Sequence, residues 1–265
     1  MSESLELEAL QRQLLTIAER LDAYRWDFEQ KKDSRCVFTY AYVLITQRIA
    51  RELPTAGYSK PRWIVELAEA FARRYVQALE GSAAGETVSP AWDVVFQAMD
   101  RKRSSVLEDL IFSMTVHIVH DLPLALVEVG MQDSDGSHIH DFHAVNTAMG
   151  EEIDDIKRCI ARRYAPYVAW LDQIGRREED LLTNYGIRMS RGLGWYNAAR
   201  ILDLASKNEA LESIEHSPQA LVAEVLNPPI YALRAGLRVG RFLVGLLRRW
   251  PRRNLAPPSL VPGTN

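Results

Sequence analysis

The chain has 265 residues and a net charge of −3, with 47% apolar and 25% charged residues, which is ordinary for a soluble globular protein with one large core. The slightly acidic balance argues against a general nucleic-acid binder, and the two cysteines, Cys36 and Cys159, are spaced neither for a disulfide framework nor for a thiolate metal site. The first residues are polar and acidic where a secretory signal would be basic and then apolar, and no run of about 18 uninterrupted apolar residues occurs, so we expect a cytoplasmic protein.

Amphipathic helices are predicted throughout the first hundred residues. In the first of them the apolar positions recur at spacings of three and four, as one face of a helix requires: Leu7, Leu10, Leu14, Ile17 and Leu21. A second helix is expected over residues 36–53, because Pro54 ends it, and a third over residues 60–81, opened by Pro61. A fourth begins after Ser89, a residue type that caps helices well.

The second half of the chain continues the helical pattern. Residues 103–121 are the most apolar segment, which we expect to run through the centre of the domain, and helical patterns follow over 140–164, over 165–205 and near the C-terminus. We find no alternating strand pattern, no internal repeat and no glycine-rich phosphate loop, so no nucleotide cofactor is expected. These patterns predict an all-α, single-domain multi-helix bundle over residues 1–250, followed by a flexible proline- and arginine-rich tail at 251–265.

Five of the six histidines lie between residues 116 and 146, on two predicted helices joined by a polar loop. Positions i, i+3 and i+4 share one face of a helix, so His117, His120 and Asp121 are expected to point the same way from the central helix. A carboxylate is unfavourable in such an apolar run unless it is paired or binds a metal ion. These three residues therefore mark the candidate site.

The following helix supplies further polar groups. If it runs antiparallel to the central helix, a rise of about 1.5 Å per residue brings Asn146 and Glu151 level with the first group, while Asp141 and His143 lie nearer the loop. A helical hairpin of this kind can direct several nitrogen and oxygen ligands at one ion. The predicted metal ligands come from both helices: His117, His120, Asp121, Asp141, His143 and Glu151.

These residues favour a metal-dependent enzyme, a hydrolase acting on an ester or phosphoester of a small molecule. A divalent ion, Zn²⁺ by the ligand types, would lower the pKa of a bound water molecule toward neutrality. His117, Asp121 and Asn146 would then form the catalytic group.

Two other functions fit the same residues. In a metal-free enzyme of isomerase or cyclase type, His117 would act as a general acid and base oriented by Asp121. Aromatic side chains would line an apolar cavity for its substrate: Tyr40, Trp92, Tyr185 and Trp195. In a non-catalytic helical binding protein, His117 and Asp121 would instead be a buried structural pair.

The C-terminal segment is strongly basic. After Glu224 the chain contains seven arginines and no acidic residue. Five of these arginines, from Arg234 to Arg249, flank an apolar stripe: Leu237, Phe242, Leu243, Leu246 and Leu247. A helix of this kind could lie on a membrane surface of anionic lipid or bind an acidic partner. The alternative is a last core helix with a basic outer face.

A series of motifs runs along most of the chain: FTYAYVLITQRIA, FARRYVQAL, PAWDVVFQA, H-x-x-x-D-L-P-L-A, D-F-x-x-V-N and RMSRGLGWYNA. Together they resemble a bacterial family known as domain of unknown function 5995. The polar positions that match its pattern are His117, Asp121, Asp141, Asn146, Arg191 and Trp195. The resemblance implies a shared fold and brings no established activity with it.

His117 and Asp121 stand four residues apart, just ahead of Pro123. This spacing bears a fainter resemblance to the all-helical zinc phospholipase C and P1 nuclease group, whose core carries H-x-x-x-D followed by a proline. That group has a second histidine just past the proline, where this chain has LALV. The resemblance therefore implies a site for one or two metal ions and not a complete trinuclear zinc site.

Overall fold

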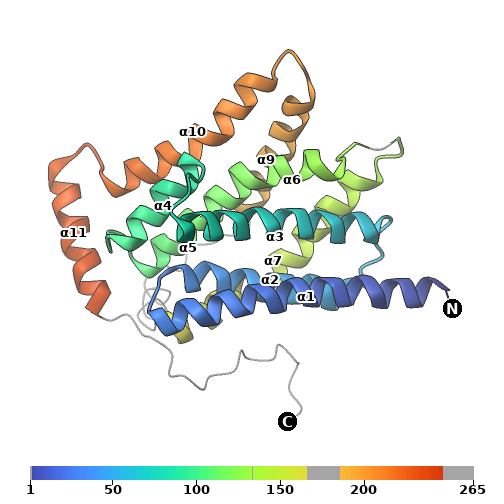
Figure 1. Ribbon diagram of the computed structural model, residues 1–265, viewed down its shortest axis with the longest axis horizontal. Helices are drawn as coiled ribbons and strands as arrows, with labels where there is room; N and C mark the ends of the chain where they lie inside the picture. The colour runs from blue at the N-terminus through green and yellow to red at the C-terminus, as the bar shows by residue number, and fades with distance from the viewer. Residues whose placement is uncertain (1, 133, 166–185, 247–265) are drawn as a thin grey trace, which may run out of the picture.

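The computed structural model describes residues 2–132, 134–165 and 186–246, and within these ranges the chain is helical and contains no strand. The predicted all-α class is therefore confirmed. The helices, labelled in Figure 1, are α1 (Ser2–Lys31), α2 (Arg35–Glu52), α3 (Pro61–Ala84), α4 (Pro90–Asp100), α5 (Val106–Val116), α6 (Leu122–Val129), α7 (Ser137–Tyr164), α9 (Gly186–Leu202), α10 (Lys207–Leu226) and α11 (Tyr231–Leu246). The predicted tail, residues 251–265, lies outside the described residues.

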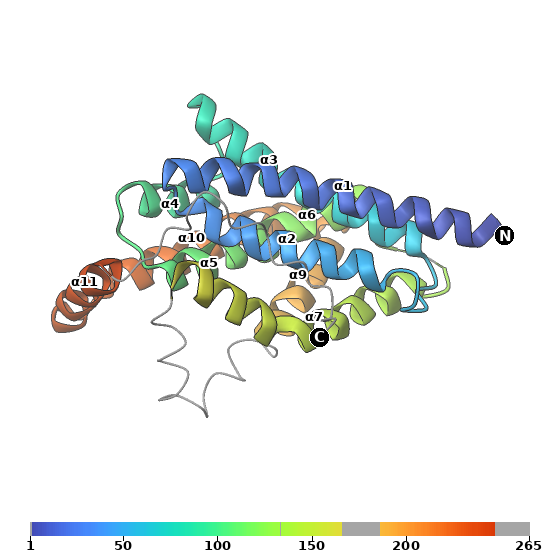
Figure 2. The same ribbon diagram turned by 90° about the horizontal axis from the view of Figure 1, so that it is seen from below.

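Helices α1 and α2 form a long antiparallel hairpin along one side of the molecule (Figure 1, Figure 2). The chain reverses direction at Lys32, which has a positive φ of 55°. The face of α1 that packs on α2 and α3 carries Leu10, Leu14 and Leu21, which are all fully buried. The apolar stripe of the first predicted helix is therefore its packed face.

A continuous helix runs through the centre of the fold from Val106 to Val129, as α5, a short middle turn and α6. A capping box fixes its start: the Ser105 hydroxyl accepts from the Glu108 backbone N–H, and the Glu108 carboxylate accepts from the Ser105 backbone N–H. By length and composition this helix is able to cross a membrane, but 67% of its most apolar window is buried inside the fold. It packs as the central core helix that the sequence predicts.

The middle of the central helix widens into one π-helical turn, His117–Asp121, here called η1. Its defining hydrogen bond runs from the Leu122 backbone N–H to the His117 carbonyl, five residues back. Pro123 follows at once. Because proline lacks an N–H and its ring crowds the carbonyl four residues earlier, the regular α-helical pattern is interrupted at this point.

Helix α9 packs closely on this widened turn through Gly194. A Cβ atom at Gly194 would lie 3.3 Å from the Ile118 carbonyl oxygen and 3.0 Å from a methyl carbon of Leu122. The lack of a side chain lets the two helices approach each other. The next residue, Trp195, packs on Phe142 of α7 with the ring centroids 5.0 Å apart, so α9 joins the central helix to α7.

Helices α10 and α11 lie toward the end of the molecule that is farthest from the N-terminus (Figure 1, Figure 2). Arg241 attaches α11 to the bundle: its guanidinium donates to both carboxylate oxygens of Glu108 and to the backbone carbonyls of Val225 and Leu226. In both views α11 stands at the edge of the bundle. Its apolar side chains Phe242 and Leu246 are exposed, so α11 is not a core helix.

Candidate functional site

Asp121 lies at the centre of a buried hydrogen-bond network on the central helix. Its Oδ2 accepts a hydrogen bond from Nδ1 of His117 at 2.7 Å and another from the indole N–H of Trp92 at 3.0 Å. Its Oδ1 lies 2.7 Å from Nδ1 of His120. Burial raises the pKa of Asp121, but the hydrogen bonds with His117 and His120 lower it by more, so the pKa lies below its ordinary value. The carboxylate is therefore charged at neutral pH.

The imidazole of His117 is 3% exposed and surrounded by aromatic rings. It stacks on Phe71 of α3, with the ring centroids 3.6 Å apart and the planes at 7°. Other rings meet it at steeper angles: Phe38, Tyr42, Tyr75 and Trp92. Because Nδ1 donates to the Asp121 carboxylate, Nε2 carries the lone pair, and no described residue offers this buried atom a hydrogen bond. Burial lowers the pKa of His117 by more than Asp121 raises it, so the ring is neutral at pH 7.

His120 extends to the other side of Asp121, where its Nε2 lies 2.8 Å from Oε2 of Glu215 on α10. Both ring nitrogens thus face carboxylate oxygens, which only accept hydrogen bonds, so the ring carries both protons. Burial lowers the pKa of His120, but the contacts with Asp121 and Glu215 raise it by more, and the pKa lies above its ordinary value. The sequence pattern predicted that His117 and His120 point the same way. In the structure both imidazoles are hydrogen-bonded to Asp121, but His117 stacks on Phe71 of α3 while His120 contacts Glu215 of α10.

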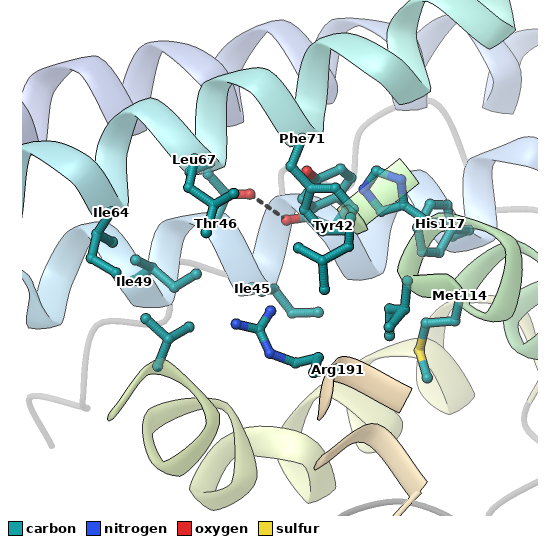
Figure 3. Close-up of a pocket in the computed structure, with 15 residues that line it drawn as sticks. Tyr42, Ile45, Thr46, Ile49, Ile64, Leu67, Phe71, Met114, His117 and Arg191 are labelled. Carbon is teal, nitrogen blue, oxygen red and sulfur yellow. Dashed lines mark hydrogen bonds between the residues drawn. The ribbon is translucent and has the colours of Figure 1, made fainter. Parts of the chain in front are cut away.

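His117 forms part of the wall of an apolar cavity of about 90 Å³ (Figure 3). One water molecule needs roughly 10–15 Å³ of such a cavity volume, so this cavity has room for a small organic group. Apolar side chains from α2, α3 and α5 make up much of the wall: Phe38, Ile45, Ile49, Ile64, Leu67, Phe71 and Met114. His117 is therefore a polar group set in a mainly hydrocarbon surface.

Three more residues with polar side chains line the same cavity: Thr46, whose hydroxyl donates to the Tyr42 backbone carbonyl, Tyr42 itself and Arg191. The Tyr42 hydroxyl is buried, and no partner for it lies within the described part of the chain. Burial raises the pKa of Tyr42 well above its ordinary value, so the hydroxyl keeps its proton and can donate it in a hydrogen bond. Arg191 enters from α9 (Figure 3), and its guanidinium carbon lies 4.3 Å from the centre of the Phe142 ring. Burial lowers the pKa of Arg191 to about 10, which still leaves it charged at neutral pH.

Asp141, one of the predicted metal ligands, has a different role in the fold. It is fully buried, and its two carboxylate oxygens accept hydrogen bonds from the backbone N–H groups of Ser59 at 2.9 Å and Lys60 at 2.6 Å. These residues form the loop that leads into α3. The structure therefore does not bring Asp141 together with His117 and Asp121, because its oxygens hold this loop to α7.

The other predicted residues of the site also lie on α7. His143 is exposed on α7. Asn146 and Glu151 follow on the same helix, and their side chains are not among those that the structure describes. Among the predicted residues whose side chains are described, His117, His120 and Asp121 are the ones that the structure brings together. Among the side chains described, no group of three or more histidine, cysteine, aspartate or glutamate residues is arranged to hold a metal ion.

The aromatic residues predicted to line the cavity need correction. Tyr40 packs instead on Tyr164 of α7, with ring centroids 5.8 Å apart. Two residues along a helix correspond to about 200° of rotation, so Tyr42 occupies the opposite face and lines the cavity. Trp92 contacts Asp121 and is not part of the cavity wall, and Tyr185 lies outside the described residues.

Two functional groups of this site, Tyr42 and Glu215, were not found by reading the sequence. Glu215 stands in the stretch LESIEHS, where it is one of several acids on an amphipathic helix. Only the packing of α10 against the central helix sets it beside His120. No local pattern separates it from its neighbours in the sequence.

A family model described as "Family of unknown function (DUF5995)" matches residues 15–228. The chain belongs to this family. No curated protein and no solved structure matches the chain, and the likeness to the zinc phospholipase C group stays a prediction. The DUF5995 match contains every described residue of the cavity wall and the Asp121 network with Glu215, and it ends before α11 begins.

Proposed function

We propose that this protein is a general acid–base enzyme of isomerase or cyclase type, which moves a proton within a small, mainly apolar molecule. The observation that carries the proposal is the buried Nε2 atom of His117, which has no hydrogen-bond partner among the described residues and belongs to a side chain that forms part of the cavity wall. Leaving a buried polar atom unpaired destabilises a fold by about 1–3 kcal/mol. A catalytic role accounts for such an atom in this position.

The hydrogen bond with Asp121 suits His117 to act as a base. It keeps the proton of the neutral ring on Nδ1 and leaves the Nε2 lone pair available. When Nε2 takes a proton from the substrate, the Asp121 carboxylate stabilises the imidazolium that forms, and the proton is returned to another atom of the same molecule. The lowered pKa keeps His117 unprotonated at neutral pH and therefore ready to accept.

The cavity wall indicates the class of substrate. Its aliphatic and aromatic side chains favour a hydrocarbon skeleton. The Tyr42 hydroxyl can donate a hydrogen bond to an oxygen atom, and the Arg191 cation stabilises negative charge that develops there. These groups fit a molecule with one carbonyl or carboxylate group, from whose neighbouring carbon His117 removes the proton.

The metal-dependent hydrolase predicted from the sequence draws less support from these residues. Ligand atoms at about 2.0 Å from a tetrahedral zinc ion stand roughly 3.3 Å apart. The Nδ1 atoms of His117 and His120 lie 2.7 Å from the Asp121 oxygens, which is a hydrogen-bond distance. Because Asp141 and His143 do not join this group, we assign no step to a metal ion.

Exchange of carbon-bound hydrogen with solvent tests the proposal. The protein is treated with EDTA, dialysed and incubated in D₂O with a panel of small apolar ketones and carboxylic acids, and deuterium incorporation is followed by NMR. We expect exchange that the substitution His117→Gln slows by about 10²–10⁴-fold, because that is the usual contribution of a general base. Tyr42→Phe should slow it by a smaller factor.

The control is His216→Gln, since His216 is an exposed histidine on α10 outside the site. This variant should keep the full exchange rate. Exchange that persists in the His117→Gln variant, or that appears only when zinc is added back, would refute the proposed role of His117.

A further inference from the structure

Helix α11 presents an apolar face to solvent. Four large apolar side chains along it are more than half exposed: Val239, Phe242, Leu243 and Leu246, with Phe242 at 68% and Leu246 at 69%. At about 3.6 residues per turn these positions fall on one side of the helix, and Arg234 and Arg241 fall on the other. The exposed apolar residues therefore form one continuous strip, which we call the α11 strip.

The two arginines on the opposite side hold α11 in this orientation. Arg234 donates two hydrogen bonds to the Pro228 carbonyl, at 3.0 and 2.8 Å. Arg241 forms a bidentate contact with Glu108 at the start of the central helix, with Nε donating to Oε2 and Nη2 to Oε1. Burial raises the pKa of Glu108, but the contacts with Arg241 and Ser105 together lower it by more, so the pair of Glu108 and Arg241 is charged at neutral pH. The side of α11 that faces the bundle is thus anchored, and the α11 strip faces outward.

Basic residues flank the α11 strip. A surface groove of about 580 Å³ runs between α11 and the loop that joins α4 to α5. Its wall contains Lys102, Arg103 and Arg238 next to Phe242 and Leu246. Sequence composition extends this basic character, since no acidic residue follows Glu224. An apolar strip beside a row of cations matches the interface of an anionic bilayer, in which phosphate groups surround a hydrocarbon interior.

We propose that the α11 strip docks on an anionic lipid surface. The four apolar side chains enter the boundary between headgroups and acyl chains, while Lys102, Arg103 and Arg238 contact lipid phosphates. The same charges disfavour a second copy of this chain as the occupant. Pairing two α11 strips would place the cations of one copy beside those of the other, and like charges brought together are destabilising.

Vesicle sedimentation with the full chain tests this docking. The protein is mixed with vesicles of phosphatidylcholine alone or of phosphatidylcholine with phosphatidylserine. We expect it to sediment with the second kind only, and less of it as the salt concentration rises, because salt screens the contacts with phosphate. Equal binding to both kinds of vesicle, or binding to neither, would overturn the proposal.

Variants separate the two contributions. The double substitution Phe242→Ala with Leu246→Ala should weaken binding by at least about tenfold through lost apolar burial. Arg238→Glu should weaken it by roughly tenfold or more, because the substitution removes an attraction to lipid phosphate and adds a repulsion. The matched control is Leu204→Ala, because Leu204 is 90% exposed in the turn between α9 and α10 and should not affect binding.

Analytical ultracentrifugation of the same variants tests whether a second copy of the chain covers the α11 strip, and binding to an acidic polymer tests for an acidic protein partner. The double variant should sediment in solution as the wild type does. A wild-type dimer that this variant dissociates would show that a second copy covers the strip and would overturn the proposal. Binding to soluble polyglutamate as tight as binding to the vesicles, and unchanged in the double variant, would overturn it in favour of an acidic protein partner.

Discussion

His117 and Asp121 are hydrogen-bonded at 2.7 Å across a single π-helical turn. One stretch of backbone carries both side chains, so their relative position does not depend on how separate helices dock. The stacked Phe71 ring fixes the plane of the imidazole. Local structure therefore holds this pair in the geometry that proton transfer requires.

The protonation state of His117 can be measured by ¹⁵N NMR. Because burial lowers its pKa, we expect the neutral ring with its proton on Nδ1 to persist below a pH of about 6.5, the ordinary pKa of histidine. Activity that uses Nε2 as a base should fall only as the pH drops through this lowered pKa. A ring that carries its proton on Nε2 at neutral pH would contradict the hydrogen bond from Nδ1 to Asp121.

Substitution of His120 should weaken the fold most at acid pH. The raised pKa of His120 means that its stabilising contribution is fully present below the unfolded pKa of about 6.5 and is lost as the pH rises through the folded pKa. His120→Gln should lower the free energy of unfolding by about 2 kcal/mol near pH 6, a typical value for hydrogen bonds to charged groups. Urea denaturation near pH 6 and near pH 9 measures the effect. A loss of unfolding free energy that grows as the pH rises would contradict the raised pKa of His120.

Asp141 should matter for stability and not for proton transfer. Asp141→Ala removes the acceptor for the backbone N–H groups of Ser59 and Lys60, so we expect a loss of about 2–3 kcal/mol in the free energy of unfolding. Deuterium exchange per folded molecule should stay within a few-fold of wild type. The control Asp27→Ala removes an exposed carboxylate paired with Lys31 on α1 and should change stability by less than about 0.5 kcal/mol. Loss of a bound metal ion as the main effect of Asp141→Ala would instead support the metal site predicted from the sequence.

Two glycines of α9 form a matched pair that tests the packing on the π-helical turn. Gly192 has no atom within 4 Å of the place where a Cβ would stand, so Gly192→Ala should stabilise the helix by about 0.5–1 kcal/mol. Gly194→Ala brings the new methyl group against the Ile118 carbonyl and Leu122, and overpacking of this kind is destabilising by about 1–3 kcal/mol. In thermal denaturation the melting temperature of Gly192→Ala should lie above that of wild type, and that of Gly194→Ala below it. Equal stability of the two would mean that α9 does not press on the turn.

The helices could be predicted from the sequence because apolar spacing is a local property. The stripe of Leu10 and Leu14 on α1 needs nothing but its own period to be recognised, and the apolar run around His117 marks the central helix in the same way. The π-helical turn could not be predicted from that run, since the apolar pattern continues through it. Its one local signal is Pro123, which interrupts the hydrogen-bond pattern.

The residues of the candidate site also fall into those that a local sequence pattern reveals and those that only the packing of helices brings in. His117 and Asp121 could be identified because two polar residues one turn apart in an apolar run stabilise each other. Tyr42 and Glu215 could not, because their roles depend on how α2 and α10 pack on the central helix. The predicted convergence with Asp141 assumed that the helix after the loop faces the central one, whereas that carboxylate binds the loop before α3.

Two buried polar atoms that have no hydrogen-bond partner among the described residues, Nε2 of His117 and the hydroxyl oxygen of Tyr42, also affect how the folded state responds to small molecules. In the unfolded chain these two atoms form hydrogen bonds to water, and folding removes those bonds. A compound that forms hydrogen bonds to both atoms therefore stabilises the folded state and not the unfolded chain. By mass action such a compound raises the melting temperature in proportion to the logarithm of its concentration. A thermal-shift screen of metabolites, run on wild type and on Tyr42→Phe in parallel, can therefore find the natural ligand before its reaction is known.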